Sequence, residues 1–373
     1  MKKNLHPVFV RSLLLATLSS IPLLASADDS FLKDLSLSGQ LDLFYQYDFN
    51  RPKTGQDIEM FRQFDTSHNT GTLAMFQLNI TKKSTEANPV GFTVNLGTGK
   101  NVNIIDPVGG PDKGTYKNLL QAYVTYAVPK TPYTVDFGKF YTWIGYEVIP
   151  SADCDNYSRS FLYTLAQPLY HAGVRISGQL SPPLSGSLYL VNGWNEVDDS
   201  NASKTLGASF TYNLGTKTAF TVNYLGGNEG SSGPSGFGGT GVSNVQLGDI
   251  VVTHQLTEKV KLAMNADYMD VKPSSAGAPS GKFTGIAGYI SAKLTKELTG
   301  VARYETVSDP DGVRGTNNAR LSSLTGTLSY AMGANSTWRL EARYDKSNRS
   351  SFADRNGTKD SRTTLTFSHV LKF

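Results

Sequence analysis

Histidine and serine are the side chains of this sequence that could most readily carry out catalysis, because a serine beside an imidazole forms a nucleophile with its base. Of the five histidines, His68 and His171 fall where the alternation of polar and apolar residues allows contact with water, whereas His254 and His369 fall on the apolar side. No G-x-S-x-G turn, H-E-x-x-H pair or informatively spaced acidic pair accompanies them. The sequence therefore predicts no catalytic residues and no enzyme, with a hydrolase that uses His68 or His171 as the least favoured alternative.

Charged residues form a second pattern, because they recur on the polar side of segments in which polar and apolar residues alternate. Residues 338–345, WRLEARYD, place four charges on one side and four apolar or aromatic residues on the other. Along the chain this polar side carries the acids Asp42, Asp48, Asp136, Asp249, Asp267, Glu305, Glu341 and Asp345 and the bases Arg175, Lys261, Lys293, Arg303, Arg339 and Arg343. Such charges are costly unless solvated or paired, so this side faces water, and its near balance of charge predicts no ion preference.

Alternation with a period of two residues predicts β-strands, and sixteen such segments follow one another along the chain. They lie near residues 35–49, 72–82, 90–97, 119–128, 133–140, 169–180, 187–194, 204–214, 219–226, 246–256, 260–270, 284–294, 298–307, 321–331, 337–346 and 363–373. Short turns and long polar links alternate between them, which is typical of hairpins in a bacterial outer-membrane barrel. The predicted fold is therefore all-β: a closed antiparallel transmembrane β-barrel of about 16 strands, with short periplasmic turns and long extracellular loops. A soluble sandwich is the alternative, in which the polar side would meet bulk water.

The first 27 residues predict the route of export. A basic, acid-free start, an apolar stretch broken by Pro22 and the small residues before Ala27 are typical of a Sec signal peptide cleaved after Ala27. Removal takes away three basic residues and no acid, which lowers the formal charge from +4 to +1. Binding of nucleic acid is therefore not predicted. We expect residues 28–373 to form a single barrel domain, and an uncleaved transmembrane helix is the alternative for the signal.

The run LTFSHVLKF, which ends in Phe373, resembles the last strand of outer-membrane barrels, whose final aromatic residue is read by the barrel-assembly machinery. The segments GKFYTWIGYEVI at 138–149, NYSRSFLYTLAQPLYHAGVRISGQL at 156–180 and LYLVNGWN at 188–195 resemble the β-barrel porin family related to the outer-membrane porin L. This resemblance implies a place in the outer membrane of a Gram-negative bacterium, in contact with lipid and lipopolysaccharide. It also implies small hydrophilic solutes as partners and leaves a homo-oligomer open. Cys154 is unexpected in that family, and as the single cysteine it excludes a disulfide framework.

The link at residues 141–168 is the predicted constriction loop. By resemblance to general porins, it folds into the barrel and places Glu147, Asp153, Asp155 and Arg159 across a narrow opening, where acid and base set a transverse field. A surface loop with scattered charges is the equally weighted alternative. Two acids fall short of the oxygen ligands that calcium needs, so we predict no metal and no cofactor.

The resemblance and the alternation together predict a porin: a water-filled channel for passive diffusion of small hydrophilic solutes. The first alternative is a barrel-anchored adhesin or structural protein, whose long loops bind a partner and whose lumen is closed. An outer-membrane hydrolase is more distant, because no catalytic motif supports it. Conductance distinguishes the porin from the barrel-anchored protein, since an open barrel of this size passes ions.

Overall fold

The computed structural model of the protein describes residues 34–53, 61–107, 112–201, 203–229, 243–276, 278 and 280–373. The predicted signal peptide and its cleavage site at Ala27 lie outside the described residues. Within the described ranges, no helix is long and apolar enough to cross a membrane.

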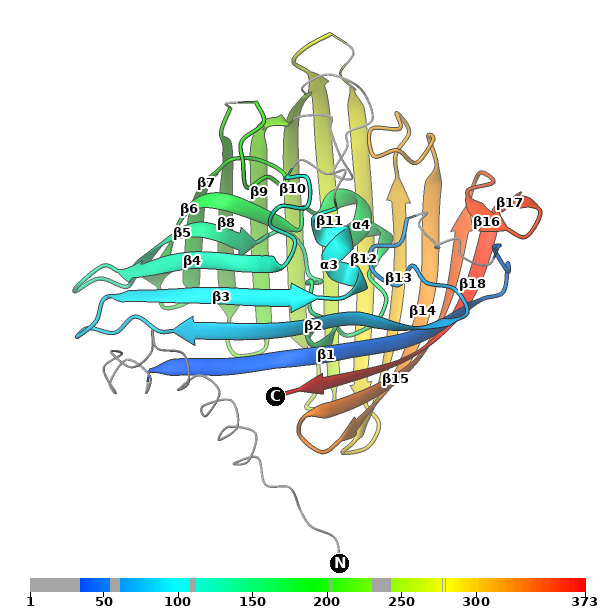
Figure 1. The fold of residues 1–373 in the computed structure, drawn as a ribbon, viewed down its shortest axis with the longest axis horizontal. Helices are drawn as coiled ribbons and strands as arrows, with labels where there is room; N and C mark the ends of the chain where they lie inside the picture. The colour runs from blue at the N-terminus through cyan, green and yellow to red at the C-terminus, as the bar shows by residue number, and fades with distance from the viewer. Residues whose placement is uncertain are drawn as a thin grey trace, which may run out of the picture.

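Sixteen strands of the described chain form one closed antiparallel barrel (Figure 1). They are β1 (Leu35–Asp48), β2 (Thr70–Lys82), β3 (Val90–Thr98), β4 (Leu119–Ala127), β5 (Tyr133–Tyr141), β6 (Tyr170–Ser181), β7 (Leu184–Val191), β8 (Thr205–Leu214), β9 (Thr218–Glu229), β10 (Ser243–Gln255), β11 (Val260–Pro273), β12 (Gly281–Lys293), β13 (Leu298–Ser308), β14 (Arg320–Met332), β15 (Ser336–Ser347) and β18 (Ser361–Lys372). Each pairs with the next along the chain, and β18 pairs with both β15 and β1 to close the barrel. The predicted segments match these strands one for one, so the predicted barrel is confirmed. A small hairpin, β16 (Phe352–Asp354) and β17 (Gly357–Lys359), was not predicted.

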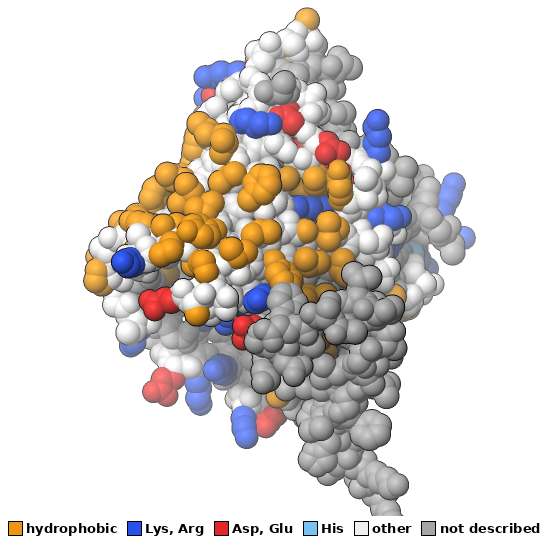
Figure 2. All heavy atoms as spheres, turned by 60° about the vertical axis from the view of Figure 1, so that its left-hand side comes forward, with side chains coloured by type: hydrophobic (Ala, Val, Ile, Leu, Met, Phe, Trp, Pro, Cys, Tyr) orange, Lys and Arg blue, Asp and Glu red, His pale blue; other side chains and the backbone are white. Residues whose placement is uncertain are grey.

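The period-two pattern separates the two faces of the wall because successive side chains of a strand point to opposite sides. In β15, Leu340 and Tyr344 are each 47% exposed on the outer face, whereas Glu341 and Arg343 are each 1% exposed on the inner face. Figure 2 shows apolar side chains gathered across the middle of one outer face, with charged side chains toward its two ends. An apolar outside and a polar inside are the reverse of a soluble globular protein.

The seam between β1 and β18 closes tightly at Gly39. The amide of Gly39 donates to the carbonyl of Phe373 at 2.8 Å, and the amide of Phe373 donates back at 3.1 Å. A Cβ at position 39 would lie 2.5 Å from the Phe373 ring, so only glycine fits beneath it. The same ring stacks on Phe76 of β2, with centroids 6.0 Å apart. Phe373 therefore ties β18 to β1 and β2 on the apolar outer face.

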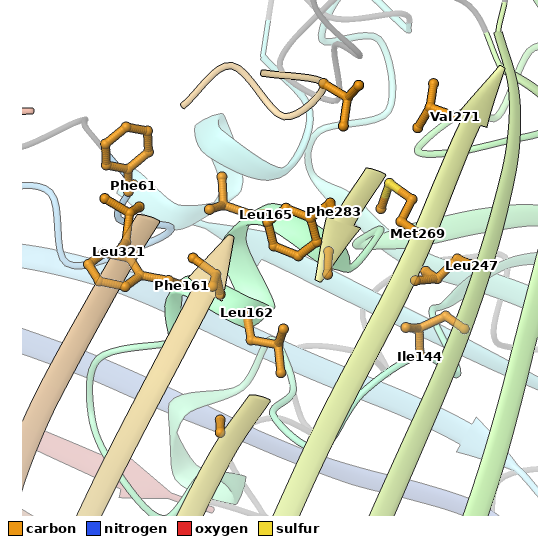
Figure 3. Close-up of a cluster of buried hydrophobic side chains, with 14 of the residues drawn as sticks. Phe61, Ile144, Phe161, Leu162, Leu165, Leu247, Met269, Val271, Phe283 and Leu321 are labelled. Atoms are coloured by element: carbon orange, nitrogen blue, oxygen red, sulfur yellow. The ribbon is translucent and has the colours of Figure 1, made fainter. Parts of the chain in front are cut away.

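Three short helical elements lie in the links: α3 (Lys100–Ile105), the 3₁₀ turn η2 (Ser151–Asp153) and α4 (Phe161–Ala166). The hydroxyl of Ser160 caps α4 by accepting from the Tyr163 amide at 2.9 Å. Figure 3 shows the apolar side chains of α4 turned toward inward residues of the wall. The buried cluster includes Phe161, Leu162 and Leu165 of α4, Leu247 of β10, Met269 of β11, Phe283 of β12 and Leu321 of β14. The helix thus lies inside the barrel.

Candidate functional site

The lumen of the barrel is the candidate functional site, and residues 142–169 between β5 and β6 lie within it. We call this segment the inward loop. Its donors reach Asp249 on β10 at 3.2 Å, Asn265 on β11 at 3.0 Å and Asp42 on β1 at 2.5 Å. Because these three side chains belong to the inner face, the inward loop runs along the inner wall and across a large part of its circumference. That it narrows the path of a solute stays a prediction.

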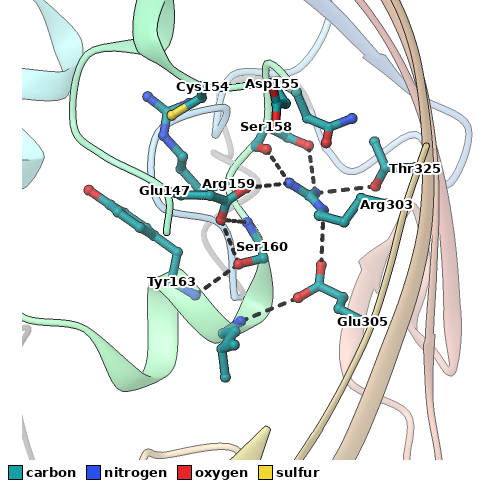
Figure 4. Close-up of polar contacts among 12 residues, drawn as sticks. Glu147, Cys154, Asp155, Ser158, Arg159, Ser160, Tyr163, Arg303, Glu305 and Thr325 are labelled. Atoms are coloured by element: carbon teal, nitrogen blue, oxygen red, sulfur yellow. Dashed lines mark hydrogen bonds and ion pairs between the residues drawn. The ribbon is translucent and has the colours of Figure 1, made fainter. Parts of the chain in front are cut away.

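Arg303 of β13 holds the middle of the inward loop (Figure 4). Its guanidinium donates to the Glu147 carboxylate at 2.7 Å and to the Ser158 carbonyl at 2.6 Å. Its Nε also lies 3.6 Å from Glu305 on its own strand. All three charged side chains are almost fully shielded from water. Arg303 therefore lies between two buried acids, one from the loop and one from the wall, and Arg343 also lies 3.4 Å from Glu305.

Two inward residues of β15 fix the adjoining backbone of the loop. Glu341 accepts from the amides of Tyr157 at 2.7 Å and Ser158 at 2.9 Å. Arg343 donates to the carbonyl of Arg159 at 2.6 Å. Charge-assisted hydrogen bonds of this kind are the stronger ones in proteins. The inward charges predicted on β15 thus include two, Glu341 and Arg343, that attach the loop to the wall.

Arg159 lies in the inward loop, but its charge does not meet an acid across open water. The guanidinium donates to the carbonyls of Val148 at 2.8 Å, Tyr157 at 2.5 Å and Ile149 at 2.7 Å. It also lies over the ring of Phe64 at 5.3 Å and is 1% exposed. The sequence-based expectation that Arg159 faces passing ions is therefore revised. Here it stabilises the turn of its own loop.

Asp153 and Asp155 lie at the far tip of the inward loop. Asp153 forms an ion pair with Lys372 at 2.7 Å, and Asp155 forms one with Lys261 at 2.9 Å. Lys261 is the second residue of β11, next to the short turn that follows β10, and Lys372 is the last residue of β18. The loop tip therefore reaches the end of the barrel where the short turns lie.

A second link reaches into the barrel, and sequence analysis missed it. Arg62 forms buried ion pairs with Asp65 and, at 2.9 Å, with Asp345 of β15. Arg362 of β18 also pairs with Asp345 at 2.9 Å. The run FRQFD at residues 61–65 carried a signal, since its aromatic residues and its charges differ from the Gly- and Ser-rich composition of an exposed link.

The fourteen charges predicted to line the pore all lie on the inner face of their strands, and the inward loop covers many of them. Besides the contacts above, Asp48 accepts from the Asn50 amide at 2.8 Å, and Asp136 pairs with Arg175 at 2.5 Å. Arg339 donates to the loop carbonyls of Ser151 and Cys154 at 2.9 and 3.1 Å. Asp267 lies opposite Asp249 in the register of β10 and β11, while Lys293 ends β12. Their role in conduction stays a prediction.

Gly145 lies near the start of the inward loop in a conformation that other residues rarely adopt, with φ at +88°. A Cβ there would collide with the side-chain amide of Gln167, while its own amide donates to Asp249. We therefore expect Gly145→Ala to loosen the loop by about 1–3 kcal/mol, through strain and a lost hydrogen bond. Limited proteolysis of the folded protein measures this, with faster cleavage inside residues 142–169. Gly326→Ala is the control because a Cβ there meets no atom within 4 Å, and equal cleavage of both variants would contradict the prediction.

His171 does not face water, contrary to the expectation from the sequence. The side chain is fully buried, Nδ1 lies 2.9 Å from the carbonyl of Gly193, and Nε2 lies 3.2 Å from the hydroxyl of Thr142. Its ring also packs against Trp143 with centroids 4.5 Å apart. Both ring nitrogens are thus occupied by structural contacts rather than directed at a nucleophile.

Cys154 is buried in the inward loop as a free thiol. Its sulfur donates to the carbonyl of Val148 at 3.3 Å and accepts from the amide of the same residue at 3.4 Å. Burial raises the pKa of the Cys154 thiol, so the group stays protonated at neutral pH. The side chain fills a tight turn of the loop.

Solved structures of outer-membrane proteins share this architecture. OmpT of Vibrio cholerae superposes with a TM-score of 0.62 at 8% identity, covering 91% of this chain and 97% of that one, and it is also known in a trimer form. An anion-selective porin from Comamonas acidovorans superposes with a TM-score of 0.61 at 10% identity, covering 91% of this chain and 99% of that one. The outer-membrane channel DcaP of Acinetobacter baumannii superposes with a TM-score of 0.59 at 12% identity, covering 91% of this chain and 97% of that one. At these identities the likeness shows the fold.

Sequence comparison supplies the family. No curated protein matches the chain. The family described as "Putative beta-barrel porin-2, OmpL-like" matches residues 34–373, which include all sixteen barrel strands. The chain therefore belongs to this family of outer-membrane β-barrel porins.

Proposed function

We propose that this porin lets small hydrophilic solutes diffuse passively along the part of the lumen that the inward loop leaves free, and that it is not an enzyme. The observation that carries the proposal is the inner wall formed by β6, β7 and β8. A cavity of about 300 Å³ lies there, lined by Ser177, Ser185, Ser187, Ser209 and Thr211. Small hydroxyl side chains leave room for water and hydrogen-bond to polar solutes.

The route to the outer membrane is part of the proposal. Removal of residues 1–27 after Ala27, passage through the periplasm and insertion by the barrel-assembly machinery agree with the apolar outer face, which needs contact with lipid and lipopolysaccharide. The trimer form of OmpT from Vibrio cholerae supports a homo-oligomer here as well.

A barrel-anchored adhesin or structural protein is the second candidate, because the inward loop and its buried ion pairs fill much of the lumen beside β10–β15. In that case the barrel carries external loops and passes no solute. A hydrolase has less support, since the histidine best placed for it, His171, is buried among structural contacts.

Planar-bilayer recording from the refolded protein distinguishes these functions. We expect reproducible single-channel steps that scale with salt concentration, because ions follow the same free path as polar solutes. Detergent buffer and heat-unfolded protein are the controls. A correctly folded barrel that gives no conductance would exclude the porin mechanism and favour the anchor.

A further inference from the structure

Acidic and basic residues of the inner wall differ in their access to water. Every inward acid of the described barrel strands is buried, and so are Arg303, Arg339, Arg343 and Arg362. Four inward bases keep their side chains in contact with the lumen: Arg175 at 24%, Lys261 at 37%, Lys372 at 50%, and Lys293, which is also exposed. The near balance counted along the sequence therefore does not describe the charge that meets water.

The inward loop contributes to this asymmetry. A loop backbone offers N–H donors, and wall carboxylates accept them: Glu341 accepts from Tyr157 and Ser158, Glu305 from Phe161, and Asp249 from Gly145. The loop therefore covers these acids, and its carbonyls cover Arg303, Arg339 and Arg343 as well. Lysine is different, because its long apolar stem lets the ammonium reach water beside a packed surface.

Acids of the loop and the wall offset part of the exposed positive charge. Asp155 pairs with Lys261, Asp153 pairs with Lys372, and Asp136 pairs with Arg175. Lys293 has no ion-pair partner among the described residues, and its backbone amide donates to Lys259 at 2.9 Å. The residue opposite Lys261 in the register is Ser291, so Lys293 is its diagonal neighbour, about 7–8 Å away on the same face.

We propose that the lumen prefers anions to cations and that Lys293, with Lys261 beside it, is the main selectivity determinant. The proposal rests on the channel function above and assigns it small anionic solutes. Both lysines lie where β11 and β12 meet the short turns, at the end that the loop tip reaches. At ~0.15 M salt a charge acts over ~8 Å, which is comparable to the distance between a pore wall and a passing ion.

The test is the reversal potential of the full protein in a planar bilayer under a KCl gradient, with chloride as the anionic probe. The reversal potential of the wild-type channel should have the sign expected when chloride permeates faster than potassium. Lys293→Glu should lower the chloride-to-potassium permeability ratio by roughly twofold or more, since two units of charge change within one screening length. Lys261→Gln should also lower the chloride-to-potassium permeability ratio, but by a smaller factor.

Lys217→Glu is the matched control, because Lys217 is an exposed lysine of the short turn between β8 and β9 and is not on an inward strand position. It should leave the ratio unchanged, and heat-dependent migration on gels verifies that all variants fold. A folded wild type without conductance overturns the channel function itself. A conducting wild type that prefers potassium, or a Lys293→Glu channel with the wild-type ratio, overturns anion preference and leaves the channel function standing.

Discussion

Channels carrying Arg303→Ala should conduct more current than wild type and lose the inward loop to protease. The substitution removes the cation that lies 2.7 Å from the buried Glu147 and leaves Glu305 with Arg343 alone, 3.4 Å away. Breaking a buried ion pair by removing one partner costs about 3–5 kcal/mol, because the remaining charge is uncompensated. The strand ladder of the barrel does not depend on this side chain. We therefore expect the loop to leave its site while the barrel persists.

Single-channel conductance and limited proteolysis measure the two consequences together. Arg320→Ala is the matched control, since Arg320 is an exposed arginine at the start of β14 on the next strand. It should change neither readout. A normal cleavage pattern and an unchanged conductance in Arg303→Ala would show that the other contacts of the loop hold it in place without Arg303.

Phe373→Ala should reduce the amount of folded barrel in the outer membrane several-fold. The ring covers Gly39 and stacks on Phe76, so the substitution removes apolar contact at the seam that closes the barrel. Loss of a half-exposed aromatic side chain costs about 1–2 kcal/mol in burial alone. We expect the recognition by the assembly machinery that is proposed above to add to this loss.

Fractionated membranes and heat-dependent gel migration give the folded amount. Lys372→Ala is the control at the neighbouring position, because its ion pair with Asp153 is about half exposed and contributes little to stability. Equal yields from the two variants would argue against a special role for Phe373.

The strands could be predicted from the sequence because their signal is local. The alternation along β15 alone places Leu340 and Glu341 on opposite faces of the wall. A shift of the strand by one residue would exchange the two faces, so the pattern allows only one arrangement. The interior of the barrel is different, since a charge of the inner face can meet water, another strand or a loop. The pattern placed Glu341 inside, but nothing near it in the sequence indicates Tyr157 and Ser158 as its partners.

The partners of Arg159 and Arg62 could not be predicted from the local sequence pattern either. By resemblance to general porins Arg159 was expected to face a narrow opening, but three nearby carbonyls that turn toward it provide a better-satisfied site. Arg62 lies in a link that alternation does not describe, and its partner Asp345 is 283 residues away along the chain. Lys372 ends β18, and its exposure depends on where the loop tip ends.

The attachment points of the inward loop also constrain the order of folding. Its contacts connect residues far apart along the chain: 104 residues separate Gly145 from Asp249, 144 separate Phe161 from Glu305, and 183 separate Ser158 from Glu341. Closing such distances is entropically unfavourable until neighbouring strands bring the ends together, so contacts of this kind form slowly. When β5 and β6 first pair, the loop has none of its wall partners and Glu147 has no arginine. The inward loop therefore reaches its final position late in folding, after the wall that surrounds it is complete.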